Sequence, residues 1–174
     1  MVLIREYRSE DSQQVEQCFI ELQEFERQIE PRRVEGEIVA KKYLQHMFEK
    51  CAQTQGKVFV LEAHNKIAGF VSVWAKVKVN GLVNKESEVA YISDLVVVAA
   101  YRGQGWGRAL LQRAEDYART QGARMLSIGV LAENTGARRL YIDFGFRENH
   151  VELLKPLRSD GEDHNPTTRR AGPS

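Results

Sequence analysis

A short run of glycine and arginine between two regular patterns is the part of this sequence best suited to chemistry. The run is Arg102-Gly103-Gln104-Gly105-Trp106-Gly107-Arg108, and it joins an apolar strand pattern to an amphipathic helix pattern. The first turn of a helix has N–H groups without intrahelical partners, and the peptide dipoles place partial positive charge there. Glycines let this backbone approach a ligand closely, and arginines can add charge-assisted contacts. The turn therefore predicts a phosphate-binding site.

Two common phosphate-binding motifs do not match this turn. A P-loop has lysine and then serine or threonine after its last glycine, whereas Gly107 is followed by Arg108 and Ala109. A dinucleotide-binding turn needs a third glycine, at a position that here is Arg108 or Leu110, depending on where the count starts. Neither motif therefore accounts for the turn.

The spacing of apolar residues predicts the elements that must position the turn. Strand patterns cover residues 2–8, 57–64, 67–77, 88–98, 124–130 and 146–157, with a turn at Asn65-Lys66. Helix patterns run from Val15 to Phe25, over residues 38–52, from the glycine turn to Gly122, and over 134–144. Hairpins join the early strands and helical crossovers join the later ones, which predicts a mixed sheet with helices on its faces. The run from Leu95 to Val98 is apolar throughout and predicts burial on both faces.

Composition and charge indicate one domain in a reducing compartment. The chain has 174 residues and a net charge of +1, so no global field favours nucleic acid or an anionic membrane. No apolar run is long enough to span a bilayer, and the start lacks a signal-peptide pattern, so a cytoplasmic protein is predicted. We expect one domain over residues 1–157 and a disordered polar tail over 158–174.

The cysteines and histidines do not form a metal-binding pattern. Cys18 and Cys51 lie within helix patterns and are predicted to be reduced buried thiols, with a single bridge between the two helices as the alternative. The four histidines, at positions 46, 64, 150 and 164, lack the spacing of metal ligands. No metal site is therefore expected.

Two blocks of the sequence resemble the GCN5-related N-acetyltransferase (GNAT) superfamily. In the first, Arg102, Gly105 and Gly107 match the family turn of Gln or Arg, two residues, Gly, one residue, and Gly or Ala, which follows a buried strand. The second, residues 134–146, is similar to the family pattern N-x-x-A-x-x-L-Y-x-x-x-G-F. Their order and separation also agree, although Ala99 stands where the family often has proline. The specific resemblance covers about residues 91–154.

The resemblance implies both the fold and the acyl donor. The fold would be α/β of the mixed α+β type, GNAT-like, with a central mixed, mostly antiparallel sheet and helices on both faces. The donor would be acetyl-CoA, with its pantetheine arm against Leu95 and Val97, where the central strand separates from its neighbour. The N–H of Val97 would polarise the thioester carbonyl. The implied cofactor-binding residues are Leu95, Val96, Val97, Arg102, Gly103, Gln104, Gly105, Trp106, Gly107, Arg108, Asn134 and Tyr141.

Tyr141 is the candidate for the general acid that the resemblance implies. It follows Asn134 by seven residues, so both lie on one helical face, two turns apart. Asn134 would bond the pantetheine amide, while Tyr141 would protonate the leaving thiolate. The alternative is that Tyr141 is a core aromatic with its hydroxyl at the rim.

Asp94 and Glu88 are candidates for the group that accepts the proton of the amine. They are six residues apart, so a regular strand would place both on the same face. Members of the family that act on polyamines carry an acidic pair at this point, and here Ser93 replaces its first member. The alternative is that Asp94 holds backbone or a basic neighbour.

The acceptor is left open between several function classes. Residues 10–37 hold nine acidic residues and three arginines. Because the family frames its acceptor with the first two helices, this segment would suit a cationic amine, and the alternative is a solvated helix face. The candidate functions are acetylation of a small-molecule amine, acetylation of a protein N-terminus or lysine, and non-catalytic CoA binding in a regulatory module. A homodimer is compatible with the resemblance, and neither nucleic acid nor membrane is an expected partner.

Overall fold

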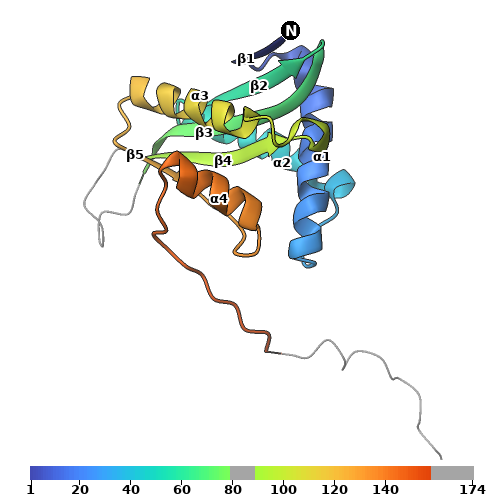
Figure 1. Ribbon diagram of the computed structural model, residues 1–174, viewed down its shortest axis with the longest axis vertical. Coiled ribbons are helices and arrows are strands. Elements are labelled where there is room, and N and C mark those ends of the chain that lie inside the picture. Colours follow the sequence, from blue (N-terminus) through green and yellow to red (C-terminus); the bar gives the residue numbers. More distant parts are fainter. Residues whose placement is uncertain (79–88, 158–174) are drawn as a thin grey trace, which may run out of the picture.

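A five-stranded sheet is the central element of the computed structural model, which describes residues 1–78 and 89–157 (Figure 1). Its strands lie in sequence order: β1 (Val2–Glu6), β2 (Lys57–Ala63), β3 (Lys66–Val77), β4 (Val89–Val97) and β5 (Met125–Ile128). Strands β1 to β4 pair with one another in antiparallel orientation, and β5 is parallel to β4. The predicted α/β fold with a mixed, mostly antiparallel sheet is confirmed.

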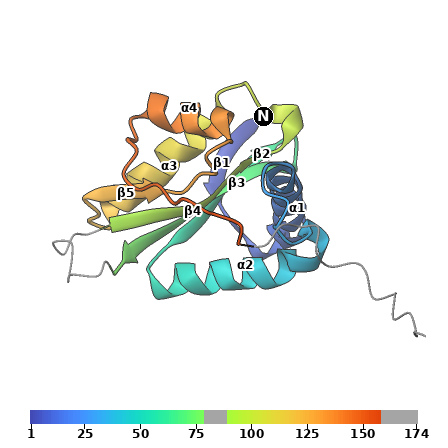
Figure 2. The same cartoon turned by 90° about the horizontal axis from the view of Figure 1, so that it is seen from below.

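Four helices cover the two faces of this sheet, as Figure 2 shows. Helices α1 (Ser12–Ile29) and α2 (Gly36–Gln53) pack on one face, and α3 (Trp106–Thr120) and α4 (Thr135–Phe144) pack on the other. Strand side chains alternate between the faces, so they supply two cores, one around Phe70 and Leu44 and the other around Phe59 and Leu110. Within residues 1–78 and 89–157, none of the helices is long and apolar enough to cross a membrane.

Local sequence signals explain where several elements begin and end. The β2–β3 hairpin turns at His64 and Asn65, whose φ angles are +52° and +62°, one residue earlier than predicted. Helix α4 begins after Asn134, whose side-chain oxygen accepts a hydrogen bond from the N–H of Ala137 at 3.1 Å. It ends at Gly145, where φ is +119°. These caps place the start of α4 against the site described below.

Strand β4 contains one extra residue relative to β3. Ile92 lies opposite Val73 and Asp94 lies opposite the adjacent Ser72, so Ser93 forms a β-bulge. A bulge interrupts the alternation of side chains between the two faces of a strand. Ile92 therefore packs in the core under α3 and α4, whereas Asp94 faces α2.

This bulge corrects the argument that paired Asp94 with Glu88. The prediction of a shared face assumed regular alternation along the strand, and the extra residue at Ser93 breaks that alternation before Asp94. Glu88 itself lies outside the described residues, as does the tail predicted over 158–174.

One further prediction is wrong, and another is confirmed in part. Residues 146–157 form no strand, and Leu153 is 89% exposed, because alternating residues become a strand only when a neighbouring strand pairs with them. The run from Leu95 to Val98 packs against both cores, as predicted, but only Val96 is fully buried and the other three are half-buried. Cys18 and Cys51 are buried and do not form a disulfide, in agreement with the prediction of reduced buried thiols.

Candidate active site

The glycine turn ends in the N-terminus of α3, where the first backbone N–H groups have no acceptor within the helix. Gly103 and Gly105 have φ angles of +73° and +85°, a conformation that favours glycine. The first intrahelical bond runs from the N–H of Ala109 to the carbonyl of Gly105, so the preceding N–H groups have no intrahelical acceptor. No atom lies within 4 Å of a Cβ built on either glycine. The turn therefore has the geometry of a phosphate-binding site.

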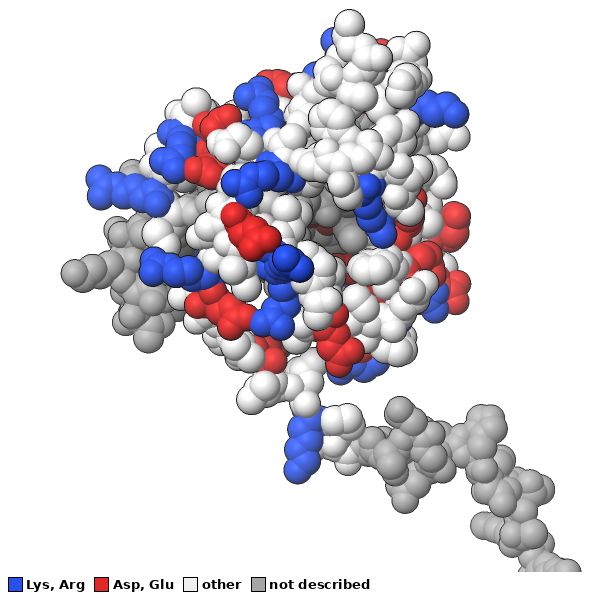
Figure 3. All heavy atoms as spheres, in the orientation of Figure 1, with Lys and Arg blue, Asp and Glu red and all other residues white. Residues whose placement is uncertain are grey.

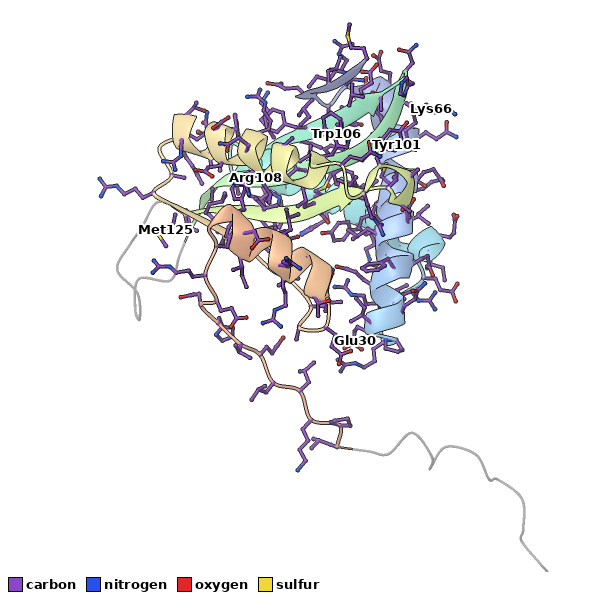
Figure 4. The ribbon with its side chains drawn as sticks, in the orientation of Figure 1. Glu30, Lys66, Tyr101, Trp106, Arg108 and Met125 are labelled. Carbon is purple, nitrogen blue, oxygen red and sulfur yellow. The ribbon has the colours of Figure 1, made fainter. Side chains whose placement is uncertain are left out.

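The third glycine of the turn has a different purpose. A Cβ on Gly107 would lie 3.0 Å from Leu140 Cδ2, so the missing side chain lets α3 and α4 approach each other. Figure 4 shows Trp106 and Arg108 on the first turn of α3, with Tyr101 in the short helix before the glycines. Gly107 thus sets helix packing, while Gly103 and Gly105 set the backbone of the binding turn.

Both arginine side chains of the turn have partners within the protein, and their predicted contacts to phosphate stay a prediction. The guanidinium of Arg102 donates to the carbonyl of Val97 at 2.8 Å and pairs with Glu21 of α1 at 3.2 Å. The guanidinium of Arg108 donates to the carbonyl of Asp143 at 3.1 Å, at the negative end of the α4 dipole. These contacts connect the turn to β4, α1 and α4.

One edge of β4 is open just before the turn. Strand β5 pairs with Val89–Ile92 only, whereas pairing with β3 continues as far as Val97. Among the described residues, no strand therefore pairs with residues 93–97 of β4 on the β5 side. Unpaired backbone groups of this kind can bind an extended ligand by strand-like hydrogen bonds. The opening begins at the Ser93 bulge, earlier in the chain than the separation expected near Val97.

A cavity of about 450 Å³ adjoins this open edge. Its walls come from α1, the α1–α2 loop, α2, β4, the chain after β5, and α4. Of the predicted residues, Asp94, Leu95, Asn134 and Tyr141 line it together, whereas the glycine turn does not. The volume falls in the range of small-molecule sites.

Asp94 is the buried acidic group of this cavity. It is 6% exposed, and it accepts hydrogen bonds from the hydroxyls of Tyr43 at 2.9 Å and Ser93 at 2.7 Å. Burial raises the pKa of Asp94 to about 6, although both hydrogen bonds oppose the rise. The carboxylate is therefore ionised at neutral pH and more basic than an ordinary aspartate, which suits a general base.

Tyr141 and Asn134 reach the cavity from the opposite side. Tyr141 is 9% exposed, and burial raises the pKa of its hydroxyl above the ordinary value, so the group keeps its proton at neutral pH. Asn134 uses its side-chain oxygen as the cap of α4, which leaves its NH₂ group as a donor. Asn134 and Tyr141 therefore line one cavity, and their roles toward the donor stay predictions.

Glu26 and Arg33 form an ion pair in the wall of the cavity, 3.0 Å apart. Burial raises the pKa of Glu26, and the charge of Arg33 opposes the rise. Elsewhere on α1 and its flanks, acidic side chains are paired with arginines, such as Asp11 with Arg5 at 2.7 Å. Figure 3 likewise shows both signs of charge interspersed on the visible face. Most acidic side chains of residues 10–37 are therefore paired with arginines, and Glu26 is the acidic residue of this segment that lines the cavity.

Sequence reasoning missed Tyr43, Glu26 and Arg33 as site residues. Tyr43 belongs to the apolar stripe of α2 and is 51 positions from Asp94 in the chain, so no local spacing connects the two. Glu26 and Arg33 were two among many charges of one segment. A helix periodicity identifies a buried stripe without showing which of its members faces a carboxylate.

Comparison with known proteins agrees with this geometry. The family model described as Acetyltransferase (GNAT) family matches residues 16–146. An uncharacterized N-acetyltransferase of Methanocaldococcus jannaschii, MJ1207, is 38% identical over 94 residues, covering 53% of this chain and 40% of that protein. The uncharacterized N-acetyltransferase YhdJ of Bacillus subtilis is 30% identical over 117 residues, covering 66% and 78%. The chain therefore spans less than half the length of MJ1207.

A solved structure shares the fold. Glucosamine-6-phosphate N-acetyltransferase from Arabidopsis thaliana superposes with a TM-score of 0.64 at 20% identity, covering 91% of this chain and 99% of that one. At that identity the likeness concerns the fold alone. The family match, however, extends over most of the sequence and includes both the glycine turn and α4. The chain belongs to the acetyltransferase (GNAT) family.

Proposed function

We propose that this protein transfers the acetyl group of acetyl-CoA to the primary amine of a small cationic molecule, by direct attack of the amine on the thioester. One observation carries the proposal. Strand β4 leads from Asp94, in the wall of the cavity, past its open edge to the anion-binding turn at the start of α3. A donor with a pyrophosphate at one end and a thioester at the other would need this arrangement.

The chain's own groups would hold the donor along this path. The N–H groups at the start of α3 would bind the pyrophosphate, and the unpaired backbone of Leu95 to Val97 would bind the pantetheine arm. The NH₂ group of Asn134 would donate to a pantetheine carbonyl. When bound, acetyl-CoA supplies an activated acetyl carbon and a thiolate leaving group.

Two groups on opposite walls of the cavity would move the protons. An alkylammonium with a pKa near that of lysine, about 10.4, must lose a proton before it attacks. Asp94 would take that proton on its carboxylate, directly or through a water molecule. Tyr141 would give its hydroxyl proton to the sulfur as the C–S bond breaks and the C–N bond forms. The attacking nitrogen loses a second proton as the amide forms, and this proton restores the hydroxyl of Tyr141, directly or through water. Asp94 then releases the first proton to solvent, so the products are the amide, the CoA thiol and one proton.

Charge and volume favour a small cationic acceptor. Glu26 and Asp94 give the cavity two carboxylates against the single guanidinium of Arg33, so its net charge is negative when both are ionised. A cavity of about 450 Å³ holds a small molecule or one amino-acid side chain. Acetylation of a lysine or an N-terminus in a protein is the competing outcome of the acceptor screen.

The first test of this proposal is binding followed by turnover. Acetyl-CoA and CoA at a hundredfold excess over Kd should stabilise the protein by about 2.7 kcal/mol in thermal unfolding, and ATP should have little effect. Release of CoA thiol should then be measured with diamines, monoamines, phosphorylated amines and lysine peptides. Absence of stabilisation by CoA would remove the donor assignment, and turnover with peptides alone would remove the small-molecule acceptor.

Glu26→Gln should weaken the binding of a diamine more than it slows the chemical step. The change removes one carboxylate and leaves the charge of Arg33 uncompensated beside the cavity. Since hydrogen bonds to charged groups contribute about 1.5–3 kcal/mol, we expect KM for a diamine to rise about tenfold or more, with a smaller change in kcat. Steady-state kinetics at fixed acetyl-CoA measures both constants.

Glu30→Gln is a matched control at the end of the same helix. Glu30 pairs with Arg32 at 2.7 Å and does not line the cavity, so KM should stay at the wild-type value. If Glu26→Gln leaves KM for cationic amines unchanged but alters KM for phosphorylated amines, Arg33 rather than Glu26 selects the acceptor.

A further inference from the structure

The carboxylate of Asp94 is held on both of its oxygens. The hydroxyl of Tyr43, from α2, donates to Oδ1 at 2.9 Å, and the hydroxyl of Ser93 donates to Oδ2 at 2.7 Å. Ser93 is the neighbour of Asp94 in the chain, so its contact restricts the carboxylate only locally. Tyr43 belongs to another element, so its contact determines how the carboxylate is placed relative to the helices that frame the cavity.

Tyr43 is itself held rigidly. Its ring stacks on Phe19 of α1, with centroids 4.4 Å apart and planes 15° from parallel. Both rings line the cavity. The bulge at Ser93 places Asp94, rather than Ser93, opposite Ser72 on the face of the sheet that α2 covers, where the hydroxyl of Tyr43 meets it. Bulge, stack and hydrogen bond therefore form one arrangement.

We propose that Tyr43 is a positioning residue that holds the Asp94 carboxylate for proton transfer. The inference rests on the proposed function, because it assigns to Asp94 the role of base. Tyr43 itself does not exchange the proton. Burial raises the pKa of Tyr43 far above neutrality, and the adjacent charge of Asp94 adds to the rise, so its hydroxyl remains a donor.

The surroundings of Asp94 define what the loss of this donor should do. The titratable or charged groups that face Asp94 or interact with it come from α1, the following loop, α2, β4 and α4; they are Glu26, Arg33, Tyr43, Cys51, Tyr91 and Tyr141. Burial and Glu26 favour the protonated acid, whereas the two hydroxyl donors and Arg33 favour the carboxylate. Removing one hydroxyl donor therefore raises the pH at which Asp94 ionises.

Tyr43→Phe tests the inference because it keeps the stacked ring and removes only the hydroxyl. We expect the acidic limb of the kcat/KM profile to move up by about one pH unit, since a hydrogen bond to a charged group is lost. The rate above that limb should remain lower than in the wild type, because the carboxylate is less restrained. Ser93→Ala removes the other donor and should shift the limb in the same direction with a smaller loss of rate.

Tyr117→Phe is the matched control. Tyr117 also donates its hydroxyl, to the carbonyl of Gln55 at 2.7 Å, but it lies on α3 outside the cavity. Its pH profile should coincide with that of the wild type. Thermal unfolding and circular dichroism of each variant show whether the fold is retained.

A measurement without turnover separates this inference from the proposed function. The carboxyl ¹³C signal of Asp94 can be titrated by NMR in the wild type and in Tyr43→Phe, with the Asp94→Asn spectrum as assignment. A higher midpoint in Tyr43→Phe is the expected result, and an unchanged midpoint overturns the inference whether or not the protein acetylates an amine. Failure of the wild type to acetylate any amine would instead remove the proposed function.

Discussion

Asp94→Asn should lower kcat by about 10²- to 10⁴-fold, the usual contribution of a positioned general base. Asparagine has nearly the same shape but cannot accept the proton of the attacking ammonium. The wild-type kcat/KM should rise with pH through about 6, where Asp94 ionises, and this limb should be lost from the residual activity of the variant. Initial rates between pH 5 and 9, at saturating acetyl-CoA, measure both effects.

The same variant should not be less stable at neutral pH. The pKa of Asp94 is higher in the folded protein, about 6, than the ordinary 3.8, so the folded state binds the proton more tightly. Stability associated with Asp94 is therefore present at low pH and is lost as pH rises from about 4 to about 6. A neutral asparagine avoids that loss. We expect a Tm at pH 8 equal to or above that of the wild type.

Asp116→Asn supplies the control for this result. Asp116 lies on α3 outside the cavity and accepts a hydrogen bond from Gln112 at 2.9 Å, so neither kcat nor the pH profile should change. Full activity in Asp94→Asn would show that another group, or water alone, takes the proton. Asp94 would then be left with a structural role beside Tyr43.

Gly105→Val should abolish binding of acetyl-CoA while the protein stays folded. Gly105 caps α3 with φ at +85°, and a β-branched residue in that conformation costs about 1–3 kcal/mol. The turn can relieve this strain only by moving the N–H groups that follow it, which would bind the pyrophosphate. We expect the increase in Tm with acetyl-CoA to disappear, and calorimetric titration should give a Kd at least about 100-fold weaker.

Gly122→Val separates loss of the binding turn from backbone strain in general. Gly122 lies just beyond the other end of the same helix, with φ at +86°, and no atom is within 4 Å of a Cβ built there. The strain is the same, but the N-terminus of α3 is untouched. This variant should lose a similar amount of stability and still bind acetyl-CoA. Wild-type affinity in Gly105→Val would falsify the assignment of the turn to the donor.

Local features of the sequence determined the glycine turn and the start of α4, where we propose that the acetyl donor binds. Gly103 and Gly105 permit a left-handed turn, and an amphipathic helix must follow it, because backbone conformation and periodicity depend on neighbouring residues. The spacing of Asn134 and Tyr141 likewise places both on one side of α4. These interactions act within a few residues, so the chain order is sufficient to predict them.

Tertiary structure alone brought together the cavity residues that we propose meet the acceptor, such as Asp94 and Tyr43. The bulge at Ser93 exists because β3 and β4 pair in one particular register, and it turns Asp94 toward a tyrosine 51 positions away. In the same way, the guanidinium of Arg102 is engaged because α1 brings Glu21 to it. Register and helix packing depend on the summed burial of distant side chains, which no local spacing encodes. The sequence by itself therefore predicts the turn and the helix that we propose bind the acetyl donor, and only the packed fold brings together the groups that we propose meet the amine.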